Sequence, residues 1–584
     1  MDTHKKLDPI VVSVVANRFE SVCKEIGETM LRTSRSPIFS EARDFVTGVF
    51  DDELRLVAQQ SYIPVQMGAM PYAIRSIARA FEGRIFEGDV FILNDPYRGN
   101  NHPPDVTIAK PVFFDGKLRF WAVSKGHHAD VGGRGVAGYN PSATDAWEDA
   151  LRIPPARLYH KGVYQEDIWN IILMNVHIPF LVEGDLHCQV GAVNIGERSL
   201  VKLLDKYGPE ILKEACDEFL MASERQMRKE ISSIPDGEYY GEQKIDHDGV
   251  DRGKMFTIRL TVRVKGDEII FDYNGTDPQT RGPFNSPMAA TASHTYLAFF
   301  SCLGPQIKHN EGSLRPIKII APEGCLLNPI EPAPTTCNGP VTSEVGGATV
   351  WLALSKAIPE KVSAGWARWC SPATAGINPR TGRPFAEIHF LSKGGGGATH
   401  GYDGWDHITP VVCLGGLRSP DPELHEVIDP FSILQYEYTK DSAGAGQWRG
   451  GLGVTYRFRV EADNIGWVNF GSGIHDDTAP FGLQGGKAAP RTRQFFIRKD
   501  GTREELDVNC FSTVEKGDIC EIFTSGGGGF GDPYLRPLEK VLDDVINGVV
   551  SIEKAESDYG VVIEPQSRTI DLEATERLRK GNQT

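Results

Sequence analysis

The amino-acid sequence predicts an α+β fold. Helical and strand-like segments are interspersed along the 584 residues without the strict alternation that a doubly wound sheet requires. Apolar residues make up 40% of the chain and charged residues 24%, a composition that is ordinary for a folded globular protein. At this length we expect several hydrophobic cores, because single cores stop growing at about 250–300 residues.

The N-terminal part begins with a predicted helix. Asp8 is suited to cap it, Pro9 suits its first position, and apolar residues return at helical spacing as far as Met30. A loop over residues 33–44 should follow. Short apolar runs then predict strands over 45–50, 54–57, 90–93, 106–112 and 120–124, separated by polar, Gly-rich or Pro-rich loops.

The middle of the chain combines both kinds of element. Residues 209–231 carry an apolar face at helical spacing and predict a second amphipathic helix. Apolar and polar residues alternate over 256–264, and a Lys265-Gly266-Asp267 turn leads into a return strand over 269–273. Residues 343–357 predict another helix.

The C-terminal part, beyond residue 380, is rich in glycine and in strand-like runs as far as residue 524. A short helix over 538–546 and a polar tail are expected to end the chain. Shifts in composition near residues 235 and 375 predict three domains. These are an N-terminal domain with the candidate site (1–235), a middle α+β domain (236–375) and a Gly-rich, strand-rich domain (376–584).

Charge and hydropathy exclude several classes of partner. The formal net charge is −16 and no basic tract of five or more residues occurs, so nucleic acid and anionic membranes are poor partners. No stretch approaches the ~20 apolar residues of a membrane-spanning helix. The first nine residues contain two lysines but no apolar leader, which predicts a cytoplasmic protein. The ten cysteines contain no C-x-x-C pair and are expected to be buried free thiols.

The candidate chemistry lies in residues 94–130. His102-Pro103-Pro104-Asp105 stands at the entry of a predicted strand, and Gly126-His127-His128-Ala129-Asp130 at the exit of another. Each His-x-x-Asp segment could form a turn hydrogen bond or hold a metal ion. Imidazole and carboxylate together suit Zn, Mn or Fe, and Asp44 could add another oxygen.

Three glycine runs could in principle bind phosphate, at residues 394–397, 450–453 and 526–531. None matches the G-x-x-x-x-G-K-[ST] pattern of a nucleotide-binding loop. Tight turns between strands are the better interpretation, because glycine tolerates backbone conformations that other residues avoid.

Several segments in order along nearly the whole chain resemble the hydantoinase B/oxoprolinase family. They include Leu31-Arg32-Thr33-Ser34, Asn94-Asp95-Pro96-Tyr97, His102-Pro103-Pro104-Asp105, Gly126-His127-His128-Ala129-Asp130, Gly138-Tyr139-Asn140-Pro141, Asn310-Glu311-Gly312-Ser313-Leu314-Arg315-Pro316, Trp448-Arg449-Gly450-Gly451-Leu452-Gly453 and Ser525-Gly526-Gly527-Gly528-Gly529-Phe530-Gly531-Asp532-Pro533. The resemblance implies the large multi-segment fold of that family.

The resemblance also implies a set of site residues. A divalent metal (Zn, Mn or Fe) would be held by Asp44, His102, Asp105 and His127. His128 and Asp130 would then act beside the metal as candidate catalytic residues, with the carboxylate orienting the imidazole. Relatives usually have a histidine where this chain has Gln66. Either an acid–base role of that histidine is lost here, or the position is structural and has drifted.

The family further implies a heteromeric complex. A hydantoinase A-type ATPase subunit would bind ATP with Mg, and this chain would supply the metal site. Relatives either hydrolyse cyclic amides such as hydantoins, 5-oxoproline or lactams, or carboxylate ketones such as acetone or acetophenone with bicarbonate. Gln66 and the unusual Cys337-Asn338-Gly339-Pro340 mark a divergent member and favour a ketone carboxylase slightly over a cyclic-amide hydrolase. A non-catalytic scaffold subunit is the third alternative.

Overall fold

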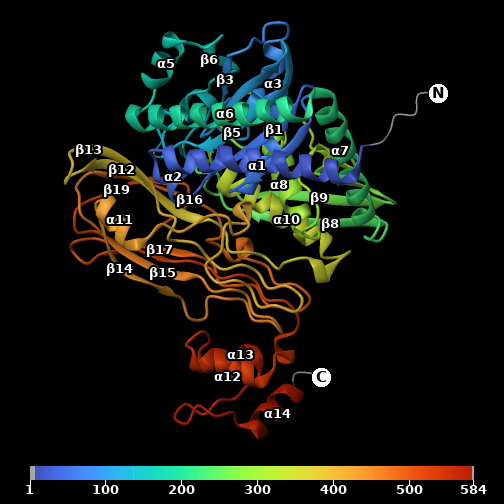
Figure 1. The fold of residues 1–584 in the computed structure, drawn as a ribbon. Helices are drawn as coiled ribbons and strands as arrows, with labels where there is room; N and C mark the ends of the chain where they lie inside the picture. Colours follow the sequence, from blue (N-terminus) through green and yellow to red (C-terminus); the bar gives the residue numbers. More distant parts are fainter. Residues whose placement is uncertain (1–6, 136, 582–584) are drawn as a thin grey trace. The chain divides into compact units, whose positions relative to one another are not determined.

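The computed structural model describes residues 7–135 and 137–581, and its helices and sheets confirm the predicted α+β class (Figure 1). The chain packs as two compact units. Unit 1 contains the residues up to 239, residues 259–339 and residues 416–418; unit 2 contains residues 240–258, residues 340–415 and the residues from 419 onward.

The predicted division into three domains, with borders near residues 235 and 375, stays a prediction. The two units group residues by how they pack, whereas a domain must also be able to fold alone. The absence of a leader was predicted from the start of the chain, and residues 1–6 lie outside the described residues.

Unit 1 is built on a seven-stranded antiparallel sheet with the order β2-β1-β5-β4-β3-β6-β7. Every strand predicted between residues 45 and 124 overlaps a strand of this sheet. The strands are β1 (Phe45–Asp51), β2 (Leu56–Ser61), β3 (Val90–Leu93), β4 (Asp105–Phe114), β5 (Lys117–His127), β6 (Ala156–His160) and β7 (Val163–Tyr164).

Helices cover both faces of this sheet. The helices of unit 1 are α1 (Pro9–Thr33), α2 (Pro37–Ser40), α3 (Met70–Ala80), α4 (Ala146–Asp149), α5 (Glu166–Leu173), α6 (Pro179–Tyr207), α7 (Pro209–Ile231), α8 (Met288–Ser301) and α9 (Glu311–Leu314). The predicted helices at residues 9–30 and 209–231 are therefore confirmed as α1 and α7.

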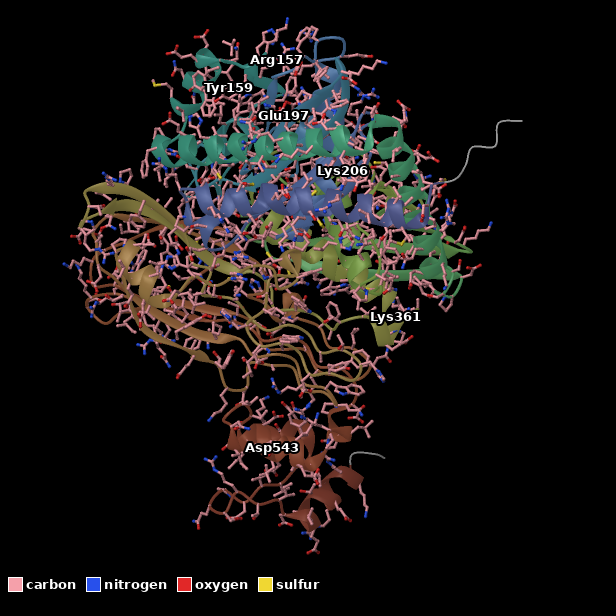
Figure 2. The ribbon with its side chains drawn as sticks, viewed as in Figure 1. Arg157, Tyr159, Glu197, Lys206, Lys361 and Asp543 are labelled. Atoms are coloured by element: carbon pink, nitrogen blue, oxygen red, sulfur yellow. The ribbon has the colours of Figure 1, made fainter. Side chains whose placement is uncertain are left out.

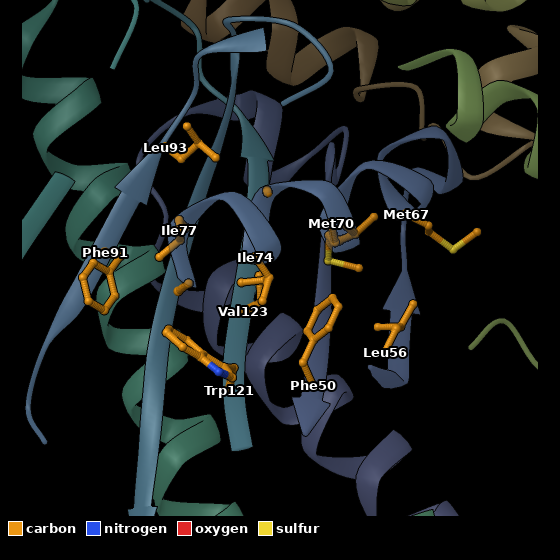
Figure 3. Close-up of a cluster of buried hydrophobic side chains, with 13 residues drawn as sticks. Phe50, Leu56, Met67, Met70, Ile74, Ile77, Phe91, Leu93, Trp121 and Val123 are labelled. Carbon is orange, nitrogen blue, oxygen red and sulfur yellow. The ribbon is translucent and has the colours of Figure 1, made fainter. Parts of the chain in front are cut away.

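Neighbouring residues of β5 show which helix covers which face. Trp121 packs with Ile74 and Ile77 of α3 in one buried cluster (Figure 3). Phe120 instead contacts Phe19 of α1, with ring centroids 5.3 Å apart. Because successive side chains of a strand point to opposite faces, α3 and α1 lie on opposite sides of the sheet.

Helix α6 packs beside α1 and against β4 and β5. Lys110 of β4 reaches this helix and donates to Asn194 Oδ1 at 2.7 Å. Its Nζ also lies 2.8 Å from a carboxylate oxygen of Glu197, which Figure 2 labels on the helix. The ion pair is half-buried, so it helps to fix the helix on the sheet.

The sequence analysis did not predict α6, although it has 29 residues. Two positions on its buried side are polar, Asp185 and Gln189, and three glycines interrupt its apolar spacing. At Gly196 an added Cβ would lie 2.7 Å from Ile26, so close packing replaces an apolar side chain there. Helices α2, α3, α4, α5, α8 and α9 were also not predicted.

A second sheet has the order β11-β10-β9-β8. The hairpin expected over residues 256–273 is confirmed, since β9 and β10 pair antiparallel with Ile269 opposite Val264. The boundary between the two units falls within β8 and β9. The strands are β8 (Gly237–Ile245), β9 (Phe256–Lys265), β10 (Glu268–Asp272) and β11 (Ile317–Ile320).

Unit 2 contains two further sheets, with the orders β13-β12-β16-β19 and β14-β15-β20-β17-β18. Phe458 and Trp467, one from each sheet, stack within a shared core with ring centroids 6.0 Å apart. The strands are β12 (Cys370–Asn378), β13 (Arg383–Ile388), β14 (Phe431–Tyr438), β15 (Val454–Val460), β16 (Ile465–Gly471), β17 (Arg493–Ile497), β18 (Arg503–Glu505), β19 (Cys510–Val514) and β20 (Ile519–Phe523).

The predicted helix near residues 343–357 and the helix at 538–546 are confirmed. The polar tail expected after residue 546 carries two more helices that were not predicted. The helices of unit 2 are α10 (Glu344–Leu354), α11 (Pro422–Ile428), α12 (Leu538–Ile546), α13 (Ile552–Tyr559) and α14 (Leu572–Gly581). None of the helices in the described part of the chain is long and apolar enough to cross a membrane.

The glycine runs of unit 2 pack against one another, and this corrects the expectation of tight turns. An added Cβ at Gly527 would lie 1.9 Å from the carbonyl oxygen of Gly396, and one at Gly450 would lie 1.8 Å from that of Gly527. Backbone hydrogen bonds join the runs, from Gly451 to Gly396 at 2.8 Å and from Gly527 to Gly451 at 2.9 Å. Glycine is required here for close approach of extended backbones.

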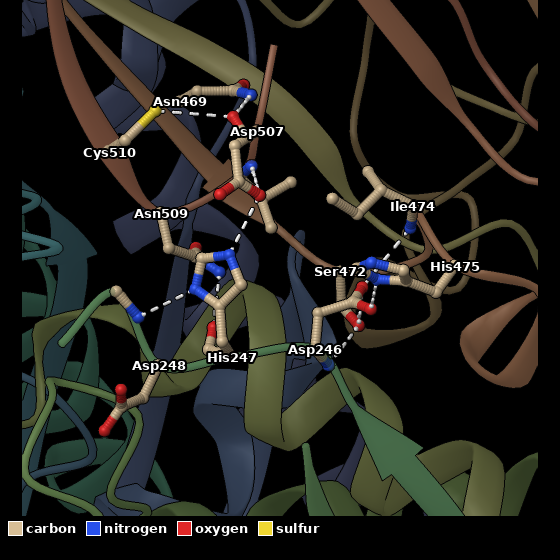
Figure 4. A network of polar contacts seen from close by, with 12 residues as sticks. Asp246, His247, Asp248, Asn469, Ser472, Ile474, His475, Asp507, Asn509 and Cys510 are labelled. Atoms are coloured by element: carbon tan, nitrogen blue, oxygen red, sulfur yellow. Dashed lines mark hydrogen bonds and ion pairs between the residues drawn. The ribbon is translucent and has the colours of Figure 1, made fainter. Parts of the chain in front are cut away.

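A buried carboxylate holds residues 240–258 within unit 2. Asp246 Oδ2 accepts hydrogen bonds from the backbone N–H groups of Gly473 and Ile474 at 2.6 and 3.2 Å (Figure 4). Its Oδ1 lies 2.7 Å from Nδ1 of His475. The two carboxylate oxygens thus satisfy donors that would otherwise be buried without a partner.

Candidate metal centre

Three titratable side chains meet at the open end of the β4–β5 hairpin in unit 1. Asp105 begins β4 and His127 ends β5, and the antiparallel register pairs them directly. Asp105 Oδ1 lies 2.9 Å from Nε2 of His102 and 3.0 Å from Nδ1 of His127. One donor atom from each residue lies within 4.8 Å of the other two, and all three side chains are buried.

The ring of His102 is held from its far side. Its Nδ1 lies 2.9 Å from the carbonyl oxygen of Thr336, 234 residues later in the chain. A proton on Nδ1 would satisfy this contact and leave Nε2, on the Asp105 side of the ring, as the atom that can coordinate a metal, which is the tautomer of a metal-binding histidine.

The Thr336 segment is fastened in turn by Asp149. Asp149 accepts hydrogen bonds from the N–H groups of Thr335 and Thr336 at 2.6 and 2.9 Å, and from the Thr336 hydroxyl at 2.5 Å. Burial raises the pKa of Asp149 to about 7, and these three donors offset only part of that effect.

Side-chain amides and one amine complete the surroundings of Asp105. Asn101 donates a short hydrogen bond to Asp105 Oδ2, and Asn338 donates to the carbonyl oxygen of Asn101 at 3.0 Å. Lys125 donates a short hydrogen bond to Asn100 Oδ1, and burial lowers the pKa of its amine to about 8. The Asn101 amide therefore binds Oδ2 of Asp105, and Oδ1 is left facing the imidazoles of His102 and His127.

Asp44 lies beside this group but is not a member of the set of convergent donors. The backbone N–H of His127 donates to the backbone carbonyl oxygen of Asp44 at 3.0 Å. Its Oδ1 accepts a hydrogen bond of 2.6 Å from Nε2 of Gln66, which is 1% exposed. Burial raises the pKa of Asp44 to about 6, and the nearby His127 partly opposes this shift.

His128 and Asp130 have partners other than each other. Nε2 of His128 lies 2.9 Å from Oε1 of Gln189 on α6, and burial lowers the pKa of this histidine. Asp130 accepts hydrogen bonds from the N–H groups of His177 and Ile178 at 2.5 and 2.6 Å, and its Oδ1 lies 3.1 Å from Nδ1 of His177. The structure places both residues next to the candidate ligands, and it directs the carboxylate of Asp130 to His177.

The donor set fits a divalent transition metal. Two imidazoles and a carboxylate are the ligands that Zn, Mn and Fe share, and the side chains converge at the separations expected of ligand atoms. Nε2 of His127 and Oδ1 of both Asn101 and Asn338 are also buried without a hydrogen-bond partner in the described ranges. Such unsatisfied buried atoms indicate that a further group belongs in the site.

Several residues of the site escaped the sequence analysis. Thr336 and Asn338 come from a segment far along the chain, and Asp149 ends a helix of only four residues. The segment Cys337-Asn338-Gly339-Pro340 attracted notice as unusual, but nothing in its spacing predicted contact with His102. Asn101 directly precedes His102 and could have been found as a polar neighbour.

Comparison with known proteins provides the context for this site. Residues 8–533 match the family described as Hydantoinase B/oxoprolinase. The chain is 35% identical to the caprolactamase subunit beta of Pseudomonas jessenii, over 99% of this chain and 100% of that protein.

Two solved structures share the fold. The crystal structure of the ATP-dependent caprolactamase from Pseudomonas jessenii superimposes with a TM-score of 0.92, at 34% identity, covering 98% of this chain and 100% of that chain. A nucleotide-free acetone carboxylase, described for its ATP-dependent carboxylation, also gives 0.92, covering 99% of this chain and 83% of that chain. The second likeness, at 20% identity, concerns the fold alone.

Proposed function

Because the chain belongs to the hydantoinase B/oxoprolinase family, we propose that it is the metal-binding subunit of an ATP-dependent enzyme that opens a cyclic amide. The observation that carries this proposal is the convergence of His102 and His127 on one oxygen of Asp105. The full-length identity of 35% to a caprolactamase subunit favours a lactam or a related ring as substrate.

The slight preference for ketone carboxylation that the sequence suggested is not retained. It rested on Gln66 and on the Cys337-Asn338 segment, and both have structural roles that are neutral between the two reactions. Gln66 binds Asp44, and Asn338 binds the backbone of Asn101.

We assign His102, Asp105 and His127 as metal ligands, with Asp44 as a fourth. A bound Zn, Mn or Fe ion would supply Lewis-acid chemistry at the amide carbonyl. Thr336 and Asn101 hold the ligands in place, and burial excludes bulk water from the site, which strengthens each polar contact there. His128 and Asp130 are assigned to holding the loop after β5, because their polar atoms already bind Gln189 and His177.

ATP would be bound by a partner subunit of hydantoinase A type, so the working enzyme would be a hetero-oligomer. The subunit name of the caprolactamase relative supports a partner. The glycine runs support the same assignment, because N–H groups in them already donate to carbonyl oxygens of neighbouring runs, Gly451 to Gly396 and Gly527 to Gly451. Such amides are not available to cradle phosphate.

The test is an activity assay on the chain purified together with its ATPase partner. We expect ATP-dependent ring opening on a panel of lactams, hydantoins and 5-oxoproline, and loss of that activity in His102→Ala. A parallel panel would measure ATP-dependent fixation of labelled bicarbonate on ketones. Fixation without ring opening would replace the proposal with a carboxylase, and full activity of His102→Ala would replace it with a scaffold role.

A further inference from the structure

A second group of convergent donors belongs to unit 2, whereas the residues assigned above belong to unit 1. Glu387 comes from β13, His425 from α11, and Asp429 stands directly after that helix. One donor atom from each residue lies within 4.8 Å of the other two. The three residues are only 4–6% exposed, so the group lies in the interior of the unit.

Hydrogen bonding does not explain the group. Nδ1 of His425 lies 3.2 Å from Oδ2 of Asp429, which is a hydrogen-bond distance, but 3.9 Å from Oε1 of Glu387, which is not. Among the residues that the structure describes, the Glu387 carboxylate has no hydrogen-bond donor and neither carboxylate pairs with lysine or arginine. One ring proton cannot satisfy two buried carboxylates.

The charge of the group is therefore unbalanced. Two carboxylates flank one imidazole where water is largely excluded, and burying charges of one sign is costly unless a cation accompanies them. A cation held among the three side chains would balance this charge.

The surroundings orient the imidazole for a ligand on its Nδ1 side. Nε2 of His425 lies 3.4 Å from the hydroxyl of Tyr456. The ring stacks on Phe431, with centroids 5.8 Å apart, and meets the edge of His389 at 5.5 Å. The ring is therefore fixed in plane, and its Nδ1 faces the two carboxylates.

We propose that Glu387, His425 and Asp429 bind a divalent transition-metal ion, of the Zn or Mn type, that fastens helix α11 to strand β13. One nitrogen and two carboxylate oxygens suit these ions, and a divalent charge balances the two carboxylates. Helix α11 has seven residues and is too short to be stable alone. A metal ion that joins α11 to β13 would stabilise this short helix.

The first test isolates this cluster from the other site. The full-length chain carrying His102→Ala and His127→Ala is loaded with Zn or Mn, freed of unbound ions by gel filtration and submitted to elemental analysis. We expect about one ion per chain, falling close to zero when Glu387→Gln or His425→Ala is added. Glu423→Gln, an exposed carboxylate on the same helix, is the matched control and should leave the ion bound.

Two results would overturn the proposal. One is that the chain carrying only His102→Ala and His127→Ala holds no metal after loading. The other is bound metal that persists when Glu387→Gln and His425→Ala are each added, since the ion would then sit elsewhere.

Thermal unfolding gives an independent test, because the effect of Glu387→Gln on stability should differ between chelator and added metal. In chelator, Glu387→Gln should unfold at the same or a higher temperature than its parent, because it removes an uncompensated buried carboxylate. With metal present, the parent should gain several degrees and Glu387→Gln should not. A variant that is less stable than its parent in chelator, or that gains as much from metal as the parent does, contradicts the proposal.

Discussion

Asp105 and His127 are register partners, the first residue of β4 and the last residue of β5, and their side chains meet at 3.0 Å. The two motifs that carry them lie more than twenty residues apart in the sequence. The hairpin between them brings both to the same end of the sheet. His102 joins them because a single tight turn separates it from β4.

The pairing leads to a prediction for metal content. His127→Ala should lower the metal bound by the purified chain by about one ion, because a transition-metal site of three or four ligands rarely survives the loss of one. Elemental analysis of the wild-type protein and the variant measures this directly. His160→Ala, a half-exposed histidine on β6 outside the site, is the control. Equal metal in His127→Ala and in wild type would remove His127 from the ligand set.

Gln66 provides a test of Asp44. Gln66→Leu removes the 2.6 Å hydrogen bond to Asp44 Oδ1 while keeping the approximate volume of the side chain. If Asp44 is a ligand, the affinity for metal should fall by about 10–100-fold, the usual effect of losing a partner that orients a ligand. A competition titration against a fluorescent chelator measures the affinity. Gln60→Leu on β2 is the matched control. An unchanged affinity in Gln66→Leu would show that Asp44 lies beside the metal without binding it.

Asp149 should make the stability of unit 1 depend on pH. Its pKa is about 7 in the folded chain and near the ordinary 3.8 when unfolded. The folded state therefore binds more protons between these values, and this contribution to stability is present below pH ~4 and lost as the pH rises to ~7.

Asp149→Asn should remove that dependence. An asparagine can keep the two backbone hydrogen bonds with its oxygen and donate its amide to the Thr336 hydroxyl. At pH 8 we expect the variant to be more stable than wild type by on the order of 2–4 kcal/mol, and to lose this advantage near pH 4. Denaturant unfolding at both pH values measures the difference. If Asp149→Asn is destabilised equally at both pH values, the hydrogen bonds of Asp149 and not its charge determine its contribution to stability.

Gly527→Ala tests the packing of the glycine runs. The added methyl group would lie 1.9 Å from the carbonyl oxygen of Gly396, and backbone cannot move aside cheaply. We expect a loss of at least about 3 kcal/mol in the free energy of unfolding, as for a severe steric clash. Gly253→Ala, where an added Cβ meets nothing within 4 Å, is the control and should change stability by less than about 1 kcal/mol. Similar effects of the two substitutions would contradict the packing.

The sequence was informative where short-range rules decide the structure. Alternation and helical spacing located the strands around His127 and the helices α1 and α7. Polar residues at the two strand ends located the candidate ligands. The sequence was uninformative where distant segments meet. Thr336 reaches His102 through the tertiary fold, and no local pattern encodes that contact. Helix α6 was hidden because Asp185 and Gln189 occupy positions on its buried side.

The glycine runs of unit 2 have a consequence for local unfolding of this unit. They belong to no sheet or helix over most of their length, so the region resembles a set of surface loops in its secondary structure. Yet Gly451 and Gly527 each donate to a neighbouring run, and all of these residues are buried. Their amide hydrogens can exchange with deuterated water only when the runs separate together. The slowest-exchanging amides of unit 2 are therefore expected in these runs as well as in the strands of its core.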